Sequence, residues 1–443
     1  MAIKLSEHFN YTKLLRFTFP TIVMMIFTSL YGIVDGIFIS NFAGSDPFAA
    51  VNIAWPIVMI FSTIGFMVGT GGSALVSKTL GEDKKEKAKR YFSMLIYFEI
   101  IAGIIFAVIG ILVVKPISQL MGAKDIILDY AVIYGRILFY ALPAFILQNS
   151  FQSFMITAER PKLGLIITLI AGVTNMILDF VLIYLCKFGV EGAAYASAIG
   201  QYVGGLIPLI FFIRKNSTHL RLVKTKIEIK PVAKACLNGL SEMMMNISLS
   251  LVNMLYNYQL LRITGKDGVI SYGIIMYVSF IFVGTFLGYS NGSAPIVSFH
   301  FGAKNTDELK NLFKRSLIII FLGSLILTGI AEVSSPLLAR IFVGYDKELY
   351  KMTLKALRIY SISFIIMGYN IYASAFFTGL NNGIVSAIIS VFRTIISEIA
   401  MIFILPIFFD LDGVWMAVSF AELISLIVSI ILLILNRKKY QYY

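Results

Sequence analysis

The sequence predicts an all-α membrane protein in which twelve transmembrane helices form two pseudo-symmetric six-helix lobes. Three observations support this prediction: the composition, the spacing of the apolar segments and an internal repeat. The chain has 443 residues, of which 58% are hydrophobic and only 14% are charged. A soluble domain needs a more polar surface than this composition supplies. Apolar segments long enough to cross about 30 Å of hydrocarbon recur from end to end.

The apolar segments define the expected helices and their order. We expect helices at residues 14–40, 48–78, 91–115, 126–158, 163–185, 190–213, 235–263, 268–299, 315–340, 350–378, 383–408 and 412–435. Several of them exceed the length needed to span a bilayer. Such helices must tilt or extend beyond the hydrocarbon.

The basic residues alternate between loops and predict the orientation. Most of the 37 Lys and Arg lie near the two termini and in the loops 78–90, 159–162, 214–234 and 303–315. Basic loops remain in the cytoplasm. We therefore expect a multi-pass protein of the cell (plasma or inner) membrane with both termini cytoplasmic. The net charge of +13 is interpreted as this topology signal, so no nucleic-acid partner is expected.

The longest linker divides the chain near its middle. We assign residues 1–213 to an N-lobe with helices one to six, and residues 214–234 to a cytoplasmic linker. Residues 235–443 then form a C-lobe with helices seven to twelve.

A repeat with one constant offset supports this division. Adding 221 to a first-half number often reaches a matching residue, since 250 − 29 = 221 joins Ser29 to Ser250. The same offset joins Gly44 to Gly265, Gly81 to Gly302 and Asn149 to Asn370. Each half contains an even number of helices, so the halves are parallel repeats about an axis along the membrane normal. The substrate is expected to pass between them near mid-membrane.

Two aspartates in otherwise apolar helices predict a cation site. Asp35 and Asp179 lie at bilayer depth, where a charge costs about 2.5–3.5 kcal/mol. Tyr31 shares a helix face with Asp35, Asn175 shares one with Asp179, and Ser197 adds a hydroxyl from the sixth helix. Hard cations prefer such oxygens, so Na⁺ is expected at Asp35, Asn175 and Asp179. A proton is the other candidate, and a purely structural role in helix packing is the alternative to both.

A polar stripe and a proline suggest further functional positions. Asn149, Gln152 and Ser153 follow one another on the fourth helix, and Asn370 occupies the equivalent place on the tenth. We expect them to line the substrate cavity, with interhelical hydrogen bonding as the alternative. Pro20 removes a backbone hydrogen bond from the first helix, which suggests a hinge there; a static kink is the alternative.

The second half carries charges of its own. Arg393, Glu398, Glu422 and Glu242 all lie in predicted helices. We expect a neutralising ion pair between Arg393 and Glu398 or Glu422, and the alternative is a second coupling site. No nucleophile with a base and no metal-ligand set lies at membrane depth, so neither an enzymatic activity nor a cofactor is expected beyond the coupling ion.

Five segments together resemble the multidrug and toxic compound extrusion (MATE) family. They are LYGIVDGIFISNFAG, GGSALVSKTLG, NMILDFVLIY, GVEGAAYASAIGQ and PIVSFHFGAKN, and the resemblance extends over nearly the whole chain. It implies two six-helix lobes of the MATE/MOP type around a central cavity. It also implies a cation-coupled antiporter that uses inward Na⁺ or H⁺ flow to export organic, mostly cationic, compounds by alternating access.

The resemblance also suggests which lobe binds the cation. In the DNA-damage-inducible-F-like branch, the site uses an aspartate of the first helix and an Asn and Asp of the fifth, which match Asp35, Asn175 and Asp179. The NorM-like branch relies on C-lobe acids, and here the eighth and tenth helices carry none. The expected partners are a small organic molecule and membrane lipid, and we expect a monomer. The alternative function is a flippase for a lipid-linked precursor of the same superfamily.

Overall fold

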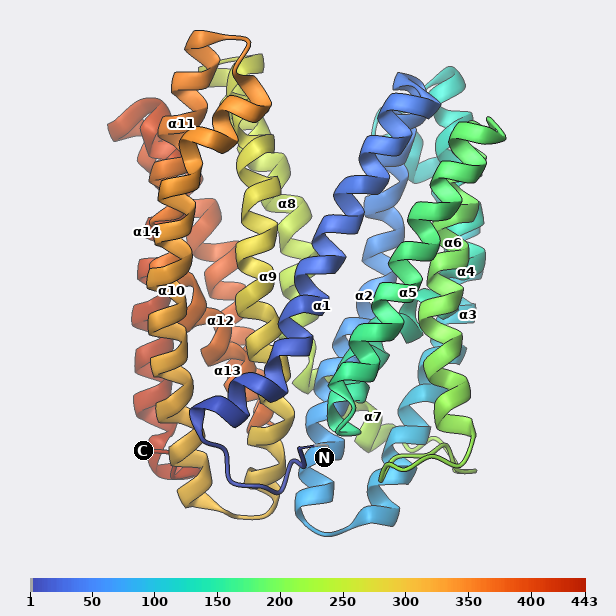
Figure 1. The fold of residues 1–443 in the computed structure, drawn as a ribbon, viewed down its shortest axis with the longest axis vertical. Helices are drawn as coiled ribbons and strands as arrows, with labels where there is room; N and C mark the ends of the chain where they lie inside the picture. The colour runs from blue at the N-terminus through green and yellow to red at the C-terminus, as the bar shows by residue number, and fades with distance from the viewer. Residues whose placement is uncertain (1–2) are drawn as a thin grey trace.

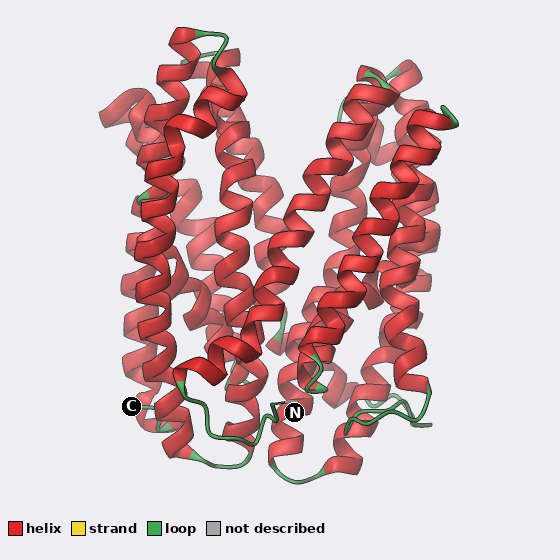
Figure 2. Ribbon diagram, in the orientation of Figure 1, coloured by secondary structure: helices red, strands yellow, loops and turns green. Residues whose placement is uncertain are grey.

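The computed structural model describes residues 3–443, which form two helical lobes without any β-strand in that range. The lobes meet at the end of the molecule where both termini lie, and they diverge toward the opposite end (Figure 1). We call the end with the termini the terminal side. Colouring by secondary structure shows that loops are confined to the two ends and to short breaks between helices (Figure 2).

The first lobe contains the six helices predicted for it. They are α1 (Tyr11–Phe38, continued by a π-helical turn at Ile39–Ala43), α2 (Ser45–Gly81), α3 (Lys85–Leu120), α4 (Asp125–Thr157), α5 (Pro161–Leu178, continued by a π-helical segment at Asp179–Leu185) and α6 (Gly189–Ile213).

The second lobe contains more helical segments because several predicted helices are interrupted. They are α7 (Ile229–Asn238), α8 (Leu240–Ile263), α9 (Lys266–Gly302), α10 (Thr306–Val343), α11 (Lys347–Ser361), α12 (Phe364–Gly379), α13 (Gly383–Val391, followed by a π-helical segment at Phe392–Ser397) and α14 (Glu398–Tyr440).

The structure shows where these helices break or bend and how the backbone is arranged at each place. The predicted seventh helix breaks at Gly239, which lies so close to the backbone of Met67 that no Cβ would fit. The predicted tenth helix consists of α11 and α12, which are bent by 45°. The predicted last two helices are joined in α14, whose backbone departs from helical geometry at Asp410 (φ 46°, ψ −128°).

The twelve-helix architecture is confirmed once these breaks are taken into account. Among residues 3–443, nine helices are long and apolar enough to cross a membrane, or ten if the bent pair α11–α12 is one span. The nine include a single segment from Gly383 to Tyr440, which the turn at Asp410 divides in two. The twelfth is α8, which carries too many polar residues to be recognised by hydropathy.

The two lobes are related by a two-fold axis along the bundle. Gly81 of α2 lies directly against the backbone of Phe299 in α9, and Gly302 of α9 lies against the backbone of Lys78 in α2. The offset of the sequence repeat relates Lys78 to Phe299 and Gly81 to Gly302. Reciprocal contacts between equivalent positions are the signature of a two-fold axis, which here passes between α2 and α9 at the terminal side.

Helix α1 is attached to both lobes. Its beginning, at Leu14 and Phe17, packs in one apolar cluster with side chains of the second lobe. Farther along, Ile22 touches Gly288 of α9 so closely that a Cβ there would overlap it. Its π-helical end, at Ile39, belongs to the core of the first lobe. In Figure 1 this helix accordingly runs obliquely from one bundle to the other.

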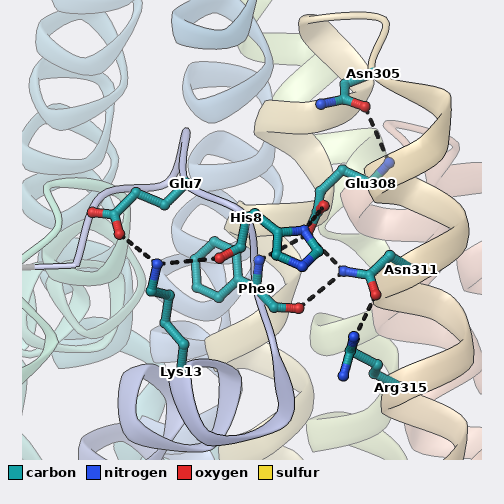
Figure 3. Close-up of polar contacts among 8 residues, drawn as sticks. All are labelled: Glu7, His8, Phe9, Lys13, Asn305, Glu308, Asn311 and Arg315. Atoms are coloured by element: carbon teal, nitrogen blue, oxygen red, sulfur yellow. Dashed lines mark hydrogen bonds and ion pairs between the residues drawn. The ribbon is translucent and has the colours of Figure 1, made fainter.

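The segment before α1 connects the lobes a second time. The backbone N–H of Leu5 donates to Glu159 Oε1 at 2.8 Å, and Glu159 lies in the turn between α4 and α5. The backbone N–H of Phe9 donates to Glu308 Oε1 at 2.9 Å, and His8 Nδ1 lies 2.7 Å from the other oxygen of that carboxylate (Figure 3). Glu308 lies in the first turn of α10, in the second lobe. Residues 3–10 therefore form a strap across the terminal side, and we call it the N-terminal strap.

Candidate cation site and interlobe pocket

The fold brings the two predicted aspartates together. Asp35 lies in the half of α1 that belongs to the first lobe, and Asp179 lies at the end of α5. The two helices approach closely where Gly172 of α5 meets the ring of Phe27. As a result, the carboxyl groups of Asp35 and Asp179 adjoin each other, and the Asn175 side chain adjoins that of Asp35.

The oxygen atoms of this group lack partners. Asp179 is 0% exposed and Asn175 is 4% exposed. Four buried oxygens accept no hydrogen bond: Oδ1 of Asp35, Oδ1 of Asn175 and both carboxylate oxygens of Asp179. Within residues 3–443, neither aspartate forms an ion pair. Buried oxygens without partners are costly, and a bound cation or proton removes that cost.

The donor set is one for a hard monovalent ion or a proton. No group of three or more His, Cys, Asp or Glu side chains is close enough to hold a metal ion in the part of the chain that the structure describes. Two carboxylates with an amide oxygen suit Na⁺ better than a transition metal, which prefers nitrogen or sulfur. The residues present therefore fit the expected ion.

Both acids lie beside irregular helix. Asp179 is the first residue of the π-helical segment Asp179–Leu185, and the backbone carbonyl of Asp35 accepts a bond from Ile39, where the other π-helical turn begins. The third π-helical segment, Phe392–Ser397, contains Arg393 in the second lobe. π-Helical turns are rare and occur often at functional sites, because they re-aim side chains within an otherwise regular helix.

Two aromatic residues complete the surroundings of the acids. The predicted Tyr31 packs on Phe27, with ring centroids 6.0 Å apart, and adjoins Asp35. Tyr134 of α4 was not predicted; its hydroxyl is buried without a partner and faces Ser197 and the acids. Nothing in the sequence distinguishes Tyr134 from an ordinary core aromatic.

The predicted polar stripe of α4 is buried, and one of its residues reaches the contact between the lobes. Asn149, Gln152 and Ser153 are each less than a tenth exposed. Ser153 lines a small interlobe pocket together with Glu242 of α8 and Thr378 of α12. Its volume of about 10 Å³ is at the lower limit of the space that one water molecule needs. The lobes are in contact here, so the pocket is narrow in this arrangement.

Asn370 occupies a different environment from the rest of the stripe. Its Nδ2 donates to Glu422 Oε2 at 2.7 Å, and its Oδ1 accepts from Ser429 Oγ at 2.9 Å. Arg393 Nε donates to the other oxygen of Glu422 at 2.6 Å, which confirms the predicted ion pair with Glu422. Asn370 is fully buried in this network, so it lines no open cavity in this arrangement.

A further buried acid, Glu99 of α3, escaped the sequence prediction. It is 0% exposed, neither of its carboxylate oxygens has a partner, and it faces Ser150 of α4. The signal that selected the two aspartates, an acid within an apolar segment, applies equally to Glu99. It lies inside the helix bundle of the first lobe.

The predicted hinge lies where α1 crosses between the lobes. Pro20 is buried, and α1 continues through it as one helix. The next residue, Thr21, contacts Gly288 of α9 through its backbone. Pro20 therefore weakens the backbone hydrogen bonding of α1 beside its contact with the second lobe.

Comparison with known families assigns the chain. The family model described as MatE matches residues 20–181 and again residues 243–404, once in each lobe. The chain belongs to the MATE family. The two matches reproduce the internal repeat and the pair of six-helix lobes.

Curated relatives and solved structures agree with this MATE assignment. The multidrug export protein MepA of Staphylococcus saprophyticus is 25% identical over 435 residues, covering 96% of this chain and 94% of that protein. MepA of Staphylococcus haemolyticus is 25% identical over 417 residues, covering 93% and 90%. Two solved structures of MATE transporters share the fold with a TM-score of 0.93. One is in complex with MaL6 (20% identity) and one is outward-facing (21% identity). Each alignment covers 99% of this chain and 98% of the other protein's chain.

Proposed function

We propose that this MATE protein is a cation-coupled antiporter that exports organic, cationic compounds by alternating access. The observation that carries the proposal is the pair Asp35 and Asp179, whose buried oxygens lack partners. Asp35 lies on α1, the helix attached to both lobes, and Asp179 lies at the end of α5. The multidrug export function named for its relatives supports the class of substrate. The acids lie in the first lobe, as in the DNA-damage-inducible-F-like branch that the sequence resembles.

Because α1 is attached to both lobes, ion binding at one end of it can move the lobes relative to each other. A Na⁺ ion or a proton at Asp35, Asn175 and Asp179 holds α1 against α5. The other half of α1 packs on α9 of the second lobe. When the ion draws α1 toward α5, the contact between α1 and α9 changes, and α1 bends at Pro20. A ligand shifts such an equilibrium only by binding one arrangement more tightly than the other.

The same proposal includes orientation and lobe boundaries. Residues 1–213 and 235–443 form the lobes, the linker 214–234 and both termini lie in the cytoplasm, and a single chain contains the whole path, as in a monomer. With the terminal side cytoplasmic, lobes that meet there and diverge at the opposite end correspond to an outward-facing arrangement.

The interlobe pocket supports a cationic substrate over a lipid-linked anion. Its lining contains the carboxyl group of Glu242 and several hydroxyls, with no Lys or Arg. A flippase for an anionic lipid-linked precursor would need basic groups at this place, so we rank it second. The pocket must widen for a substrate, which requires the lobes to separate on the terminal side.

The test is transport in vesicles of purified protein. A fluorescent cationic dye is followed first under a Na⁺ gradient and then under a pH gradient, and the gradient that drives dye movement identifies the ion. We expect Asp35→Asn and Asp179→Asn each to abolish gradient-driven transport while the protein still folds. Asp46→Asn, an exposed acid in the first turn of α2, is the matched control and should transport normally. Normal transport by both site variants would refute the proposal.

A further inference from the structure

The terminal side of the second lobe carries a basic pocket unrelated to the cation site. It has a volume of about 290 Å³ and lies between the beginning of α10 and the end of α14. Its lining consists of Thr306, Lys310, Arg437, Lys438, Gln441 and Tyr443. Three of these six side chains are cationic and none is acidic.

The cations of this pocket are not neutralised by the protein. Within residues 3–443, no ion pair involves Lys310, Arg437 or Lys438. Other lysines of the terminal side do have acidic neighbours, such as Lys84 with Glu82 at 2.8 Å. Three like charges around one pocket repel each other, and an anion between them removes that repulsion.

The pocket opens where the lipid-facing surface of α14 ends. Ile434 and Leu435 are 53% and 71% exposed, and they close a long series of exposed apolar residues on this helix. Arg437 follows two residues later, which is about 3 Å along the helix axis. Because the exposed apolar residues give way to basic ones here, we expect the hydrocarbon region to end and phospholipid phosphates to lie near the pocket.

We propose that this pocket binds a phosphate group, and that an anionic phospholipid headgroup supplies it. The planar guanidinium of Arg437 can donate two parallel hydrogen bonds to phosphate oxygens, and the ammonium groups of Lys310 and Lys438 add charge. The Thr306 hydroxyl and the Gln441 amide are further donors. A bound headgroup connects α10 to α14 from outside the bundle.

A topology signal alone does not account for this arrangement. Basic residues that only orient a chain act during insertion and need no common pocket. They also do not distinguish between headgroups after insertion. Binding that is selective for anionic lipid and depends on these three side chains separates the two explanations.

Calorimetry on the purified full-length protein in detergent tests the proposal. Short-chain dihexanoyl-phosphatidylglycerol, dihexanoyl-phosphatidylcholine and inorganic phosphate are titrated separately. We expect phosphatidylglycerol to bind at least about tenfold more tightly than phosphatidylcholine. The variant Lys310→Gln/Arg437→Gln/Lys438→Gln should lose at least about tenfold in affinity, because it removes every charge-assisted bond.

A matched control removes the same charge from the same side of the molecule. In Lys84→Gln/Lys85→Gln/Lys87→Gln the three lysines lie outside the pocket, and binding should change less than about twofold, as for exposed charges in general. Equal binding of the two phospholipids, or equal losses in the two variants, would overturn the proposal. Inorganic phosphate binding as tightly as phosphatidylglycerol would show that the lipid assignment is wrong. If the triple variant does not fold, Arg437→Gln alone should still weaken binding severalfold.

Discussion

Arg393 and Glu422 are joined by a 2.6 Å hydrogen-bonded ion pair in the second lobe. The first lobe instead contains two acids, Asp35 and Asp179, with no basic side chain of residues 3–443 paired to them. The lobes therefore share a fold but not an electrostatic design. In the second lobe one buried carboxylate is paired with an arginine, whereas in the first lobe neither Asp35 nor Asp179 has a basic partner among the described residues.

Breaking the Arg393–Glu422 pair should destabilise the protein. The two side chains are 11% and 4% exposed, so Glu422→Gln leaves a buried guanidinium without its hydrogen-bonded carboxylate partner. We expect a loss of about 3–5 kcal/mol in the free energy of unfolding. The double variant Arg393→Gln/Glu422→Gln should lose less than the sum of the single variants, measured by denaturant unfolding in detergent. Strict additivity would show that the pair contributes no coupling.

Adding a methyl group at the two-fold axis should separate the lobes on the terminal side. In Gly302→Ala the new Cβ would overlap the backbone of Lys78, and overpacking of this kind costs about 1–3 kcal/mol. We expect spin labels at Glu82→Cys and Lys304→Cys to move apart in a double electron–electron resonance experiment. Gly323→Ala is the control, because no atom lies within 4 Å of its Cβ position. An unchanged distance distribution in both variants would contradict the contact.

Removing the acceptor of the N-terminal strap should release it. Glu308→Ala deletes the partner of the Phe9 backbone, of His8 and of Asn311 Nδ2. We expect faster hydrogen exchange at the Phe9 amide and a larger population with the lobes apart at the terminal side. We expect the free energy of unfolding to fall by about 1–3 kcal/mol, because several hydrogen bonds to one charged group are removed together.

The strap also contains its own control. Glu7 accepts from Lys13 at 2.7 Å at the surface, and this hydrogen bond holds the pKa of Glu7 below its ordinary value. The pair is therefore formed at neutral pH and is lost only as the pH falls through the lowered pKa. Exposed pairs contribute little, so Glu7→Ala should leave the Phe9 exchange rate nearly unchanged. Equal acceleration in the two variants would mean that Glu308 does not anchor the strap.

The hydroxyl of Tyr134 should contribute to cation binding. Tyr134→Phe keeps the buried ring and removes only the oxygen that faces the acids. The hydroxyl has no partner in the part of the chain that the structure describes, so the prediction is that it gains one when the ion is bound. A hydrogen bond to a charged group contributes about 1.5–3 kcal/mol, and its loss corresponds to roughly a 10- to 150-fold weaker affinity for the coupling ion. The ion concentration that gives half-maximal transport measures it, with Tyr130→Phe on the same helix as the control. If that concentration does not change in Tyr134→Phe, the hydroxyl does not contribute to ion binding.

Most of the fold could be predicted because hydropathy and the repeat act over long segments. All twelve predicted helices are present, and the offset that relates Gly81 to Gly302 is visible as a contact across the axis. The separation of the last two helices between residues 408 and 412 was predicted, and the backbone departs from helical geometry there at Asp410. The break at Gly239 could not be predicted, since it depends on close packing against the backbone of Met67. The course of α1 from one lobe to the other could not be predicted either, because it depends on how the two halves are placed relative to each other.

The candidate site was predictable where charge alone marks it. Asp35, Asn175 and Asp179 were selected by membrane cost and helical spacing, and the fold brings them together. Their role in transport stays a prediction until the variants are measured. Tyr134 and Asn370 show the limit of such reasoning, because an aromatic or an amide in a helix has many possible neighbours and only the packing selects one.

The oblique course of α1 has a consequence for how the protein is made. Its first half is buried against α9, which leaves the ribosome about 270 residues later; at 5–20 residues per second this takes roughly 15–50 s. During that time the apolar surface around Leu14 and Phe17 has no partner from its own chain. The first helix to enter the membrane is thus among the last to reach its final position, and the first six helices expressed alone would lack half of the packing that α1 requires.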